Sequence, residues 1–568
     1  MSVDRRRALK LLGLGALSPA AASPMAANPS ETPSRFRHGV ASGDPTSTRL
    51  IIWTRITPRD SDRAAALPLT WVVAEDPQFR HVAARGAATA APDRDFTVKI
   101  DVAGLSPGRD YFYRFRASAE DSPVGCARTL PGGPIDRLVL AFTTCAHYQR
   151  GLFNVYDAIA RLPRVDAVIH LGDYIYEDGA DPAGGGAWAL AERLGRKMEP
   201  AHELISLTDY RLRHALHKTD PDLQAAHARA AWICVWDDHE SANDCWFGGA
   251  EGHHPKTDGS WSLRKAAAIR AYYEWMPIRE PGPGRAAEAI NRSFQFGDLA
   301  SLIMLETRLI ARSHQVSYDT DAPIRSGPDG RPVPDIAFFR ARLNDPSRQM
   351  MGLAQEAWLA RELSASIASG RTWQVIGNQV VMAQVIAPNI KVLLGPVLTP
   401  ALIAILPPDR REQGAKIGEM FAHHLPYNLD AWDGYPAARE RVYQAFRAAG
   451  ARPIVVSGDS HAFWANELID ADASHVGVEF GVTGITSPGV CDIVPGLPIN
   501  RFVEEANPNV RFTDHGAKGF VLLTLTHQEA IGELIAVSTI QSKPYETRAL
   551  KRYRVTPEAV GLSQLTEI

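Results

Sequence analysis

Hydrophobic and polar residues alternate in short runs over the first part of the chain. From Phe36 to about Arg128 the runs read SGDPTSTRLIIWTRI, LTWVVAED, DFTVKIDVAGL and DYFYRFRAS, and proline, glycine and aspartate separate them. Alternation with a period of two predicts half-buried strands, and closely spaced turn signals are typical of all-β domains. We therefore expect a small β-sandwich domain over residues 36–130.

The pattern changes after the proline- and glycine-rich stretch LPGGPID, residues 130–136. Continuous apolar runs predict buried strands in LVLAFTTC, VDAVIHLGD, AWICVWDDHE, LASLIMLETR, TWQVIGNQ and ARPIVVSGDSH. Helical periodicity marks the segments between them: FNVYDAIARL, LTDYRLRHALHK, SLRKAAAIRAYYEWM, QEAWLARELSAS and ARERVYQAFRAAG. Alternating strands and helices predict an α/β domain over residues 136–545, with residues 546–568 as a C-terminal tail.

One segment of this second domain is almost wholly apolar. It runs from Val380 to Leu406, VVMAQVIAPNIKVLLGPVLTPALIAIL, and it contains Pro388, Pro396, Pro400 and Lys391. Prolines and a lysine within so short a run argue against a transmembrane helix. The sequence leaves two interpretations: core or a surface-packed hairpin, or an apolar flap beside a site entrance.

The N-terminus, MSVDRRRALKLLGLGALSPAAASPMAAN, predicts an export signal over residues 1–27. Arg5 and Arg6 precede a short apolar stretch that is about half a membrane span, and small residues follow it. This is the pattern of a twin-arginine signal, so we expect a periplasmic or secreted protein; the alternative is a disordered basic tail. Cleavage would remove Asp4, Arg5, Arg6, Arg7 and Lys10, which changes the formal charge from −3 to about −6.

Composition narrows the class of protein further. A net charge of −3 with no basic cluster beyond the N-terminus gives no support for nucleic-acid binding. Five cysteines are an odd number and exclude a dense disulfide framework, so at least one thiol has another use.

Four predicted strands end in side chains that bind metals. The segments are TTCAHYQRG with Cys145, HLGDYIYE with Asp173 and Tyr176, WDDHES with Asp237, Asp238 and His239, and SGDSHAFW with Asp459 and His461. Ligands of open α/β sheets gather at the carboxyl ends of the strands, and glycine before aspartate allows a tight turn there. A thiol, a phenol, carboxylates and imidazoles together predict a metal centre.

These segments, with FNVY and WDGYP, resemble the PhoD-like alkaline phosphatases, a branch of the calcineurin-like metallophosphoesterase superfamily. The resemblance extends over nearly the whole chain. It implies an α/β fold with an N-terminal fibronectin-like β-sandwich, followed by a calcineurin-like metallophosphoesterase α/β/β/α sandwich. The phrase AGLSPGRDYFYRFRA is itself similar to late strands of fibronectin-type sandwiches.

The resemblance also implies the metals and their ligands. Fe³⁺ would be held by Cys145, Asp173, Tyr176 and His461. Asp173 would also contact Ca²⁺, together with Asp238 and Asp459 and with Asp237 as a further contributor, and His239 would contact phosphate. Anionic phenolate and thiolate donors suit Fe³⁺, and calcium takes several oxygens in irregular geometry. Spacing alone leaves zinc or another divalent metal open.

Two positions depart from the family pattern. Ala146 stands where many relatives have a glutamine after the cysteine, so any hydrogen bond of that glutamine is lost. Glu306 stands where aspartate is usual before Thr-Arg, and Arg308 of that segment suits a strand-end ion pair better than a phosphate contact.

The function implied is that of an exported alkaline phosphatase that releases phosphate from phosphomonoesters and some diesters. Metal-activated hydroxide or oxide would attack phosphorus, with Asp173 and His239 as the catalytic residues. One alternative is a phosphodiesterase or phospholipase D-like hydrolase of phospholipids, and another is a non-catalytic exported metal-binding protein. The expected partners are small phosphate esters, and the oligomeric state is left open.

Overall fold

The computed structural model describes residues 34–180, 186–327, 332–389, 391–393, 395 and 411–568. The predicted export signal, residues 1–27, lies outside these residues. Within them, no helix is both long enough and apolar enough to cross a membrane.

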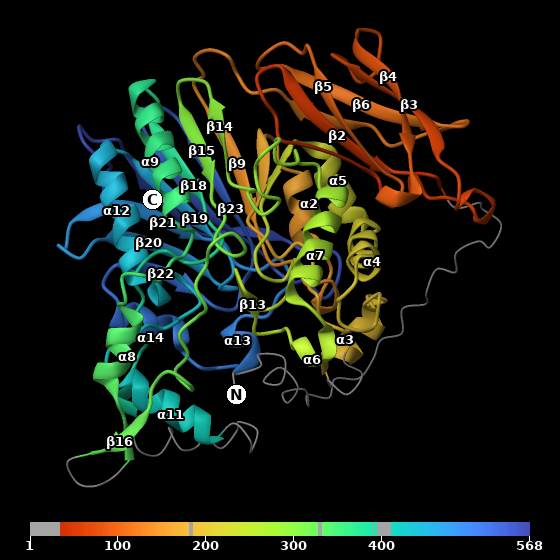
Figure 1. Ribbon diagram of the computed structural model, residues 1–568. Coiled ribbons are helices and arrows are strands. Elements are labelled where there is room, and N and C mark those ends of the chain that lie inside the picture. Colours follow the sequence, from red (N-terminus) through yellow and green to blue (C-terminus); the bar gives the residue numbers. More distant parts are fainter. Residues whose placement is uncertain (1–33, 181–185, 328–331, 390, 394, 396–410) are drawn as a thin grey trace.

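Two large sheets lie face to face and helices cover their outer faces, so the main domain has four layers (Figure 1). The first sheet has ten strands in the order β26-β25-β24-β23-β9-β10-β11-β1-β2-β5. Strands β9, β10 and β11 are parallel, so their carboxyl ends meet at one edge. The bounds are β26 Thr566–Glu567, β25 Thr547–Val555, β24 Ala530–Val537, β23 Lys518–Leu525, β9 Leu138–Thr143, β10 Ala167–His170, β11 Trp232–Cys234, β1 Val40–Gly43, β2 Arg49–Arg55 and β5 Thr97–Ala103.

The second sheet has seven strands in the order β14-β15-β18-β19-β21-β20-β22. Strands β15, β18, β19 and β21 are parallel, so they too present their carboxyl ends together. The bounds are β14 Arg292–Phe296, β15 Ala300–Met304, β18 Trp373–Gly377, β19 Pro453–Ser457, β21 His475–Gly481, β20 Phe463–Ile469 and β22 Val510–Asp514. The strands β15, β18 and β19 are buried at every position, which explains why they read as continuous apolar runs.

Helices on the two outer faces complete the layers (Figure 1). One group comprises α2 Asn154–Ala160, α4 Leu207–Lys218, α5 Pro221–Arg229 and α7 Trp261–Trp275, and the other α9 Leu353–Ala368 and α12 Pro436–Ala449. Local sequence sets their ends: Ser206 begins α4 with a capping box, and Gly450 ends α12 with a φ of 61°. Shorter helices are α3 Gly186–Leu194, α6 Pro255–Asp258, α8 Ile336–Leu343, α11 Arg411–Phe421, α13 Val490–Ile493 and α14 Ile499–Ala506.

The N-terminal strands form a sandwich, but one of its layers belongs to the main sheet. A separate sheet contains β3 Leu67–Ala74, β4 Val82–Ala90, β6 Asp110–Ala117, β7 Glu120–Asp121 and β8 Gly125–Arg128. The other layer, β1, β2 and β5, continues the ten-stranded sheet, because β1 pairs in parallel with β11 and Gly43 lies opposite Trp232. The two layers enclose their own apolar core.

The C-terminal residues are part of the fold, and the expectation of a tail over residues 546–568 is wrong. Strand β25 pairs antiparallel with β24 along its whole length, and β26 pairs with β25. The side chains of Tyr553 and Val555 are buried in the main core. Alternation is confined to the last residues of the strand, where Tyr553 and Val555 are buried and Arg554 is exposed.

The described part of the apolar segment 380–406 is mostly core. Val380, Met382 and Ala383 are fully buried, and the carboxylate of Glu479 accepts hydrogen bonds from the backbone amides of Met382 and Ala383. The flap was the alternative for the whole segment 380–406, and residues 390, 394 and 396–406 of it lie outside the described residues.

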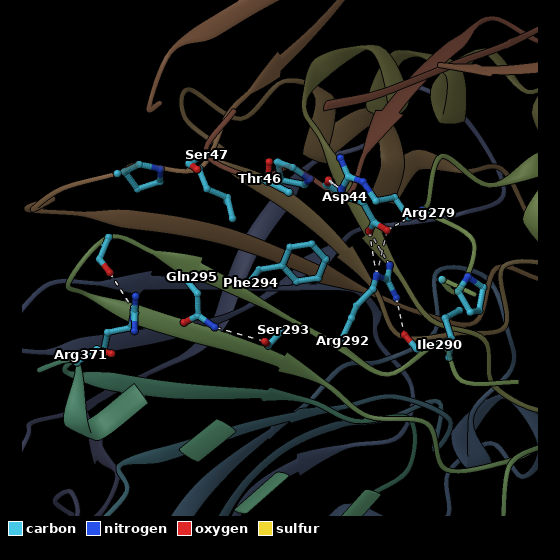
Figure 2. Close-up of a pocket in the computed structure, with 18 of the residues that line it drawn as sticks. Asp44, Thr46, Ser47, Arg279, Ile290, Arg292, Ser293, Phe294, Gln295 and Arg371 are labelled. Carbon is cyan, nitrogen blue, oxygen red and sulfur yellow. Dashed lines mark hydrogen bonds and ion pairs between the residues drawn. The ribbon is translucent and has the colours of Figure 1, made fainter. Parts of the chain in front are cut away.

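A cleft of about 760 Å³ lies where the N-terminal strands meet the β14–β15 hairpin (Figure 2). Asp44 forms an ion pair of 2.7 Å with Arg292 at one end, and Arg371 lines the other. Gly297 and Arg371 precede β15 and β18, whereas Arg292 pairs with Met304 at the carboxyl end of β15, so the cleft runs along the edge strand β14. It is lined by none of the predicted metal-binding residues.

Candidate metal centre

The predicted metal-binding residues come together at the carboxyl ends of strands from both sheets. Cys145 follows β9, Asp173 follows β10 and Asp237 follows β11, all from the first sheet. Asp459 and His461 follow β19 of the second sheet. Parallel strands place the loops after them at one edge, which brings segments more than 300 residues apart into one site.

Three overlapping groups of side chains could each hold a metal ion. The first is Cys145, Asp173 and His461; the second is Asp173, Asp238 and His239; the third is Asp237, Asp238 and Asp459. The ligand atoms of each group lie within 4.8 Å of one another. Asp173 belongs to the first two groups and Asp238 to the last two, so the groups form one continuous centre.

Tyr176 completes the first group. Its hydroxyl lies 3.0 Å from Oδ2 of Asp173 and 3.2 Å from Nε2 of His461. The Ser487 hydroxyl donates to the same oxygen at 2.7 Å, a contact that supports an anionic phenol. Ser487 was not predicted, because nothing in its local sequence distinguishes it from other loop serines.

The backbone at these positions is strained. Four of the residues have left-handed backbone: φ is 58° at Cys145, 57° at Asp173, 59° at Asp459 and 56° at His461. Such a conformation costs a non-glycine residue about 1–3 kcal/mol and persists only where the surrounding structure imposes it. Strain concentrated at four candidate ligands indicates that the loops are shaped to direct these side chains to one place.

A glycine makes one of these turns possible. Gly172, which precedes Asp173, has a φ of 113°. A Cβ atom at this position would lie 2.4 Å from Cβ of Asp237. The β10 and β11 loops can therefore lie this close together only because residue 172 has no side chain.

The electrostatics of the site fit cations. Burial raises the pKa of the Cys145 thiol, the Asp173 and Asp237 carboxyls and the Tyr176 phenol well above their ordinary values. No donor among the described residues reaches Oδ2 of the buried Asp237. A metal ion would reverse these shifts, because it stabilises the anionic form of each ligand.

Arg308 supplies a fixed positive charge beside the carboxylates. Its guanidinium is fully buried and forms ion pairs with Asp237, with Asp430 at 2.7 Å and with Asp459 at 3.3 Å. The structure therefore places it in buried ion pairs, and it engages one oxygen of Asp237. Asp430, four residues before the WDGYP segment's Gly434, was not predicted, because its partner is 122 residues away.

His239 stands at the edge of the centre and is held by a carboxylate. Its Nδ1 lies 2.7 Å from Oε2 of Glu177, and its ring lies 4.1 Å from the ring of Tyr176. Burial lowers the pKa of His239, but the carboxylates of Asp238, Glu177 and Asp173 outweigh it and the pKa is raised well above the ordinary value. Glu177 is the last residue of the motif HLGDYIYE, so its place beside the predicted ligands Asp173 and Tyr176 could have identified it as a site residue.

Glu240 ties the β10 and β11 loops together. Its buried carboxylate accepts hydrogen bonds from the amides of Asp173 at 2.9 Å, Tyr174 at 2.6 Å and Asp237 at 2.8 Å. Burial raises the pKa of Glu240 to about 7. The residue was missed although it lies within the WDDHE motif.

The two departures from the family pattern have simple consequences here. Ala146 is buried, its amide donates to the Asp173 carbonyl at 2.8 Å, and its methyl group offers no hydrogen bond. Glu306 accepts hydrogen bonds from the Trp236 indole and from the amides of Arg308, Leu309 and Ile310, so it shapes the turn after β15.

Comparisons with known proteins agree with these observations. Residues 140–534 match the PhoD-like phosphatase family, and residues 20–131 match the N-terminal domain of PhoD-like phosphatases. Alkaline phosphatase D of Bacillus subtilis (strain 168) is 32% identical over 507 residues, which is 87% of this chain and 76% of that protein. A solved structure of PhoD aligns with a TM-score of 0.73 and 29% identity, over 95% of this chain and 94% of the other. The fold expected from the sequence is confirmed, and the chain belongs to the PhoD-like phosphatase family.

Proposed function

We propose that this protein is an exported, metal-dependent alkaline phosphatase that releases phosphate from phosphomonoesters and, more slowly, from some diesters. The observation that carries the proposal is the convergence of a thiol, a phenol, carboxylates and imidazoles at the carboxyl ends of strands from two sheets. Membership of the PhoD-like phosphatase family supports the same activity.

The metals we propose are Fe³⁺ and Ca²⁺. Cys145, Asp173, Tyr176 and His461 would hold the iron, because thiolate and phenolate are anionic donors. Asp173, Asp238 and Asp459 would supply oxygens for calcium, with one oxygen of Asp237 available beside them. When bound, the cations would supply the positive charge that activates water and neutralises the phosphoryl group.

The side chains of the protein would orient the phosphate ester. Because Nδ1 of His239 faces Glu177, its Nε2 is the nitrogen that would donate to a phosphoryl or leaving-group oxygen. The Glu177 carboxylate at Nδ1 favours the protonated imidazole that this donation needs. Arg308, buried among its carboxylate partners, would balance charge and stay out of contact with the ester.

Phosphate release by the purified protein tests the activity. Protein supplied with Fe³⁺ and Ca²⁺ should hydrolyse a monoester faster than a bis-aryl diester or phosphatidylcholine. Faster turnover of phosphatidylcholine would favour the phospholipid alternative. No turnover of any ester by metal-loaded protein would favour a metal-binding protein without catalysis.

Metal analysis and absorption spectra test the metal assignment. Phenolate or thiolate bound to Fe³⁺ should give a visible charge-transfer band, and Tyr176→Phe should shift or bleach it. A colourless and fully active zinc-loaded protein would contradict the iron assignment.

Export is a proposal that rests on residues 1–27 alone. A reporter protein fused behind these residues should appear outside the cytoplasm in cells with a twin-arginine translocase. Replacing Arg5 and Arg6 together by lysine should retain the reporter inside, and export that survives this change would contradict the assignment.

A further inference from the structure

A small hairpin begins immediately beyond the candidate metal centre. Its strands are β12 Cys245–Trp246 and β13 Gly249–Ala250. The amide of Asp244, one residue before the hairpin, donates to Oδ2 of Asp238 at 2.6 Å. A chain advances at most about 3.6 Å per residue, so Trp246 begins within about 7 Å of that anchoring point and Phe247 within about 11 Å.

Several contacts fix the hairpin against the core. The Gln315 side chain donates to the Asp244 carbonyl at 3.0 Å, and the Phe247 amide donates to the Arg312 carbonyl at 3.1 Å. Cys245 is fully buried. Gly249 lies against the Trp246 indole so closely that a Cβ atom there would be 2.6 Å from the ring. The side chains at the tip are therefore presented from a rigid support.

The tip presents aromatic rings. The Trp246 ring packs on the His314 ring with centroids 4.1 Å apart. Phe247 is 57% exposed, and one face of its ring lies 5.1 Å from the Lys265 ammonium, which also pairs with Glu288 at 2.9 Å. An exposed phenylalanine is not needed for packing, and an aromatic ring with one face in solvent can stack on a planar group.

We propose that Phe247, supported by Trp246 and His314, binds the leaving group of the substrate and favours phosphomonoesters whose alcohol carries a planar aromatic group, such as nucleotides. The inference rests on the proposed phosphatase function and adds the class of substrate. The Phe247 amide lies within about 11 Å of the Asp244 amide, which contacts Asp238, so the base of a nucleotide whose phosphate is held at the metal centre has only a short distance to cross to the hairpin. Stacking on an aromatic side chain tolerates any base.

The test compares two monoesters of primary alcohols, adenosine 5′-monophosphate and glycerol phosphate. Phe247→Ala should lower kcat/KM for the nucleotide about 10- to 100-fold, mainly through KM, and leave glycerol phosphate within about twofold. Phe338→Ala is the matched control, since Phe338 is 52% exposed on α8 and should change neither substrate.

Other results would overturn the inference. An unchanged ratio of the two substrates in Phe247→Ala would show that the ring does not contact the leaving group. Equal losses for both substrates would show that the hairpin acts only through the metal centre. With phosphatidylcholine assayed as a third substrate, a loss confined to that lipid would assign the ring to acyl chains.

Failure of the phosphatase proposal would look different. Wild-type protein would then release phosphate from neither monoester. Adenosine binding, measured by calorimetry without any turnover, would still separate the two ideas: wild-type protein and Phe338→Ala should bind adenosine, and Phe247→Ala should bind it about tenfold more weakly or not at all. Equal binding by all three proteins would overturn the inference.

Discussion

Glu177 and His239 form a buried carboxylate–imidazole pair, with Oε2 of the glutamate 2.7 Å from Nδ1 of the histidine. The second oxygen of Glu177 accepts a hydrogen bond from the Asn243 amide at 2.9 Å, so the carboxylate is itself oriented. The pair determines which ring nitrogen of His239 can turn toward a substrate.

Replacing Glu177 by glutamine should weaken the hold on His239 without removing a candidate metal ligand. We expect kcat to fall about 10- to 100-fold while the metal content of the purified protein stays the same. Steady-state kinetics and metal analysis measure the two quantities. Glu192→Gln, at a half-exposed carboxylate on α3, should change neither. Wild-type kcat in Glu177→Gln would show that His239 is positioned by other contacts.

Replacing Arg308 by methionine should destabilise the fold, because it leaves buried carboxylates without their cation. The expected loss in the free energy of unfolding is about 3–5 kcal/mol in the presence of a chelator, measured by urea denaturation. Arg342→Met removes a half-exposed ion pair with Asp321 and should cost less than about 1 kcal/mol. Equal stabilities of the two variants would contradict the role given to Arg308.

Replacing Gly172 by alanine should separate the β10 and β11 loops, because the new Cβ would meet Asp237. We expect lower metal content and a lower thermal midpoint. Gly195→Ala is the matched control: Gly195 also has a positive φ, 67°, but no atom lies within 4 Å of the added Cβ. The control variant therefore bears only backbone strain of about 1–2 kcal/mol. Full metal content in Gly172→Ala would contradict the close contact between the β10 and β11 loops.

Lys218 should make stability depend on pH. Its ammonium is buried against the Trp53 ring at 4.5 Å and lies 3.1 Å from Nε2 of His227, and burial lowers the pKa of Lys218 to about 7. Between pH 7 and about 10.4, the unfolded lysine binds a proton that the folded one does not. The free energy of unfolding should therefore fall as the pH falls through this range, by at most about 1.4 kcal/mol per pH unit.

Replacing Lys218 by methionine should remove this slope. The gain in urea midpoint over the wild type should be larger at pH 7 than at pH 10. Lys197→Met, at a lysine whose side chain is 62% exposed, should show no such difference. A gain for Lys218→Met that is the same at both pH values would mean that the amine stays charged in the fold.

Much of the fold could be predicted from short stretches of sequence. The runs that become β9, β10, β15, β18 and β19 are buried on both faces, so they read as continuous apolar segments. The helices α4 and α9 show the helical period. Strand β25 was missed, because it is exposed along most of its length and its burial alternates only over the last three residues, Tyr553 to Val555.

The candidate site also contains residues that the local sequence predicts and residues that it does not. Cys145, Asp173, Tyr176 and His461 lie in motifs where glycine, aspartate and metal-binding side chains follow a strand, so their chemistry is visible locally. Asp430 and Ser487 have no such signal, because their partners Arg308 and Tyr176 lie 122 and 311 residues away.

The sequence by itself determined the kinds of element, the order of strands and helices along the chain and the residues able to bind metal, because hydrophobic period and motif spacing are properties of neighbouring residues. Only the tertiary structure decided that β1, β2 and β5 extend the main sheet and that Arg308 neutralises three carboxylates from separate loops. Pairing between distant segments depends on which surfaces meet when the chain packs, and no local pattern encodes that choice.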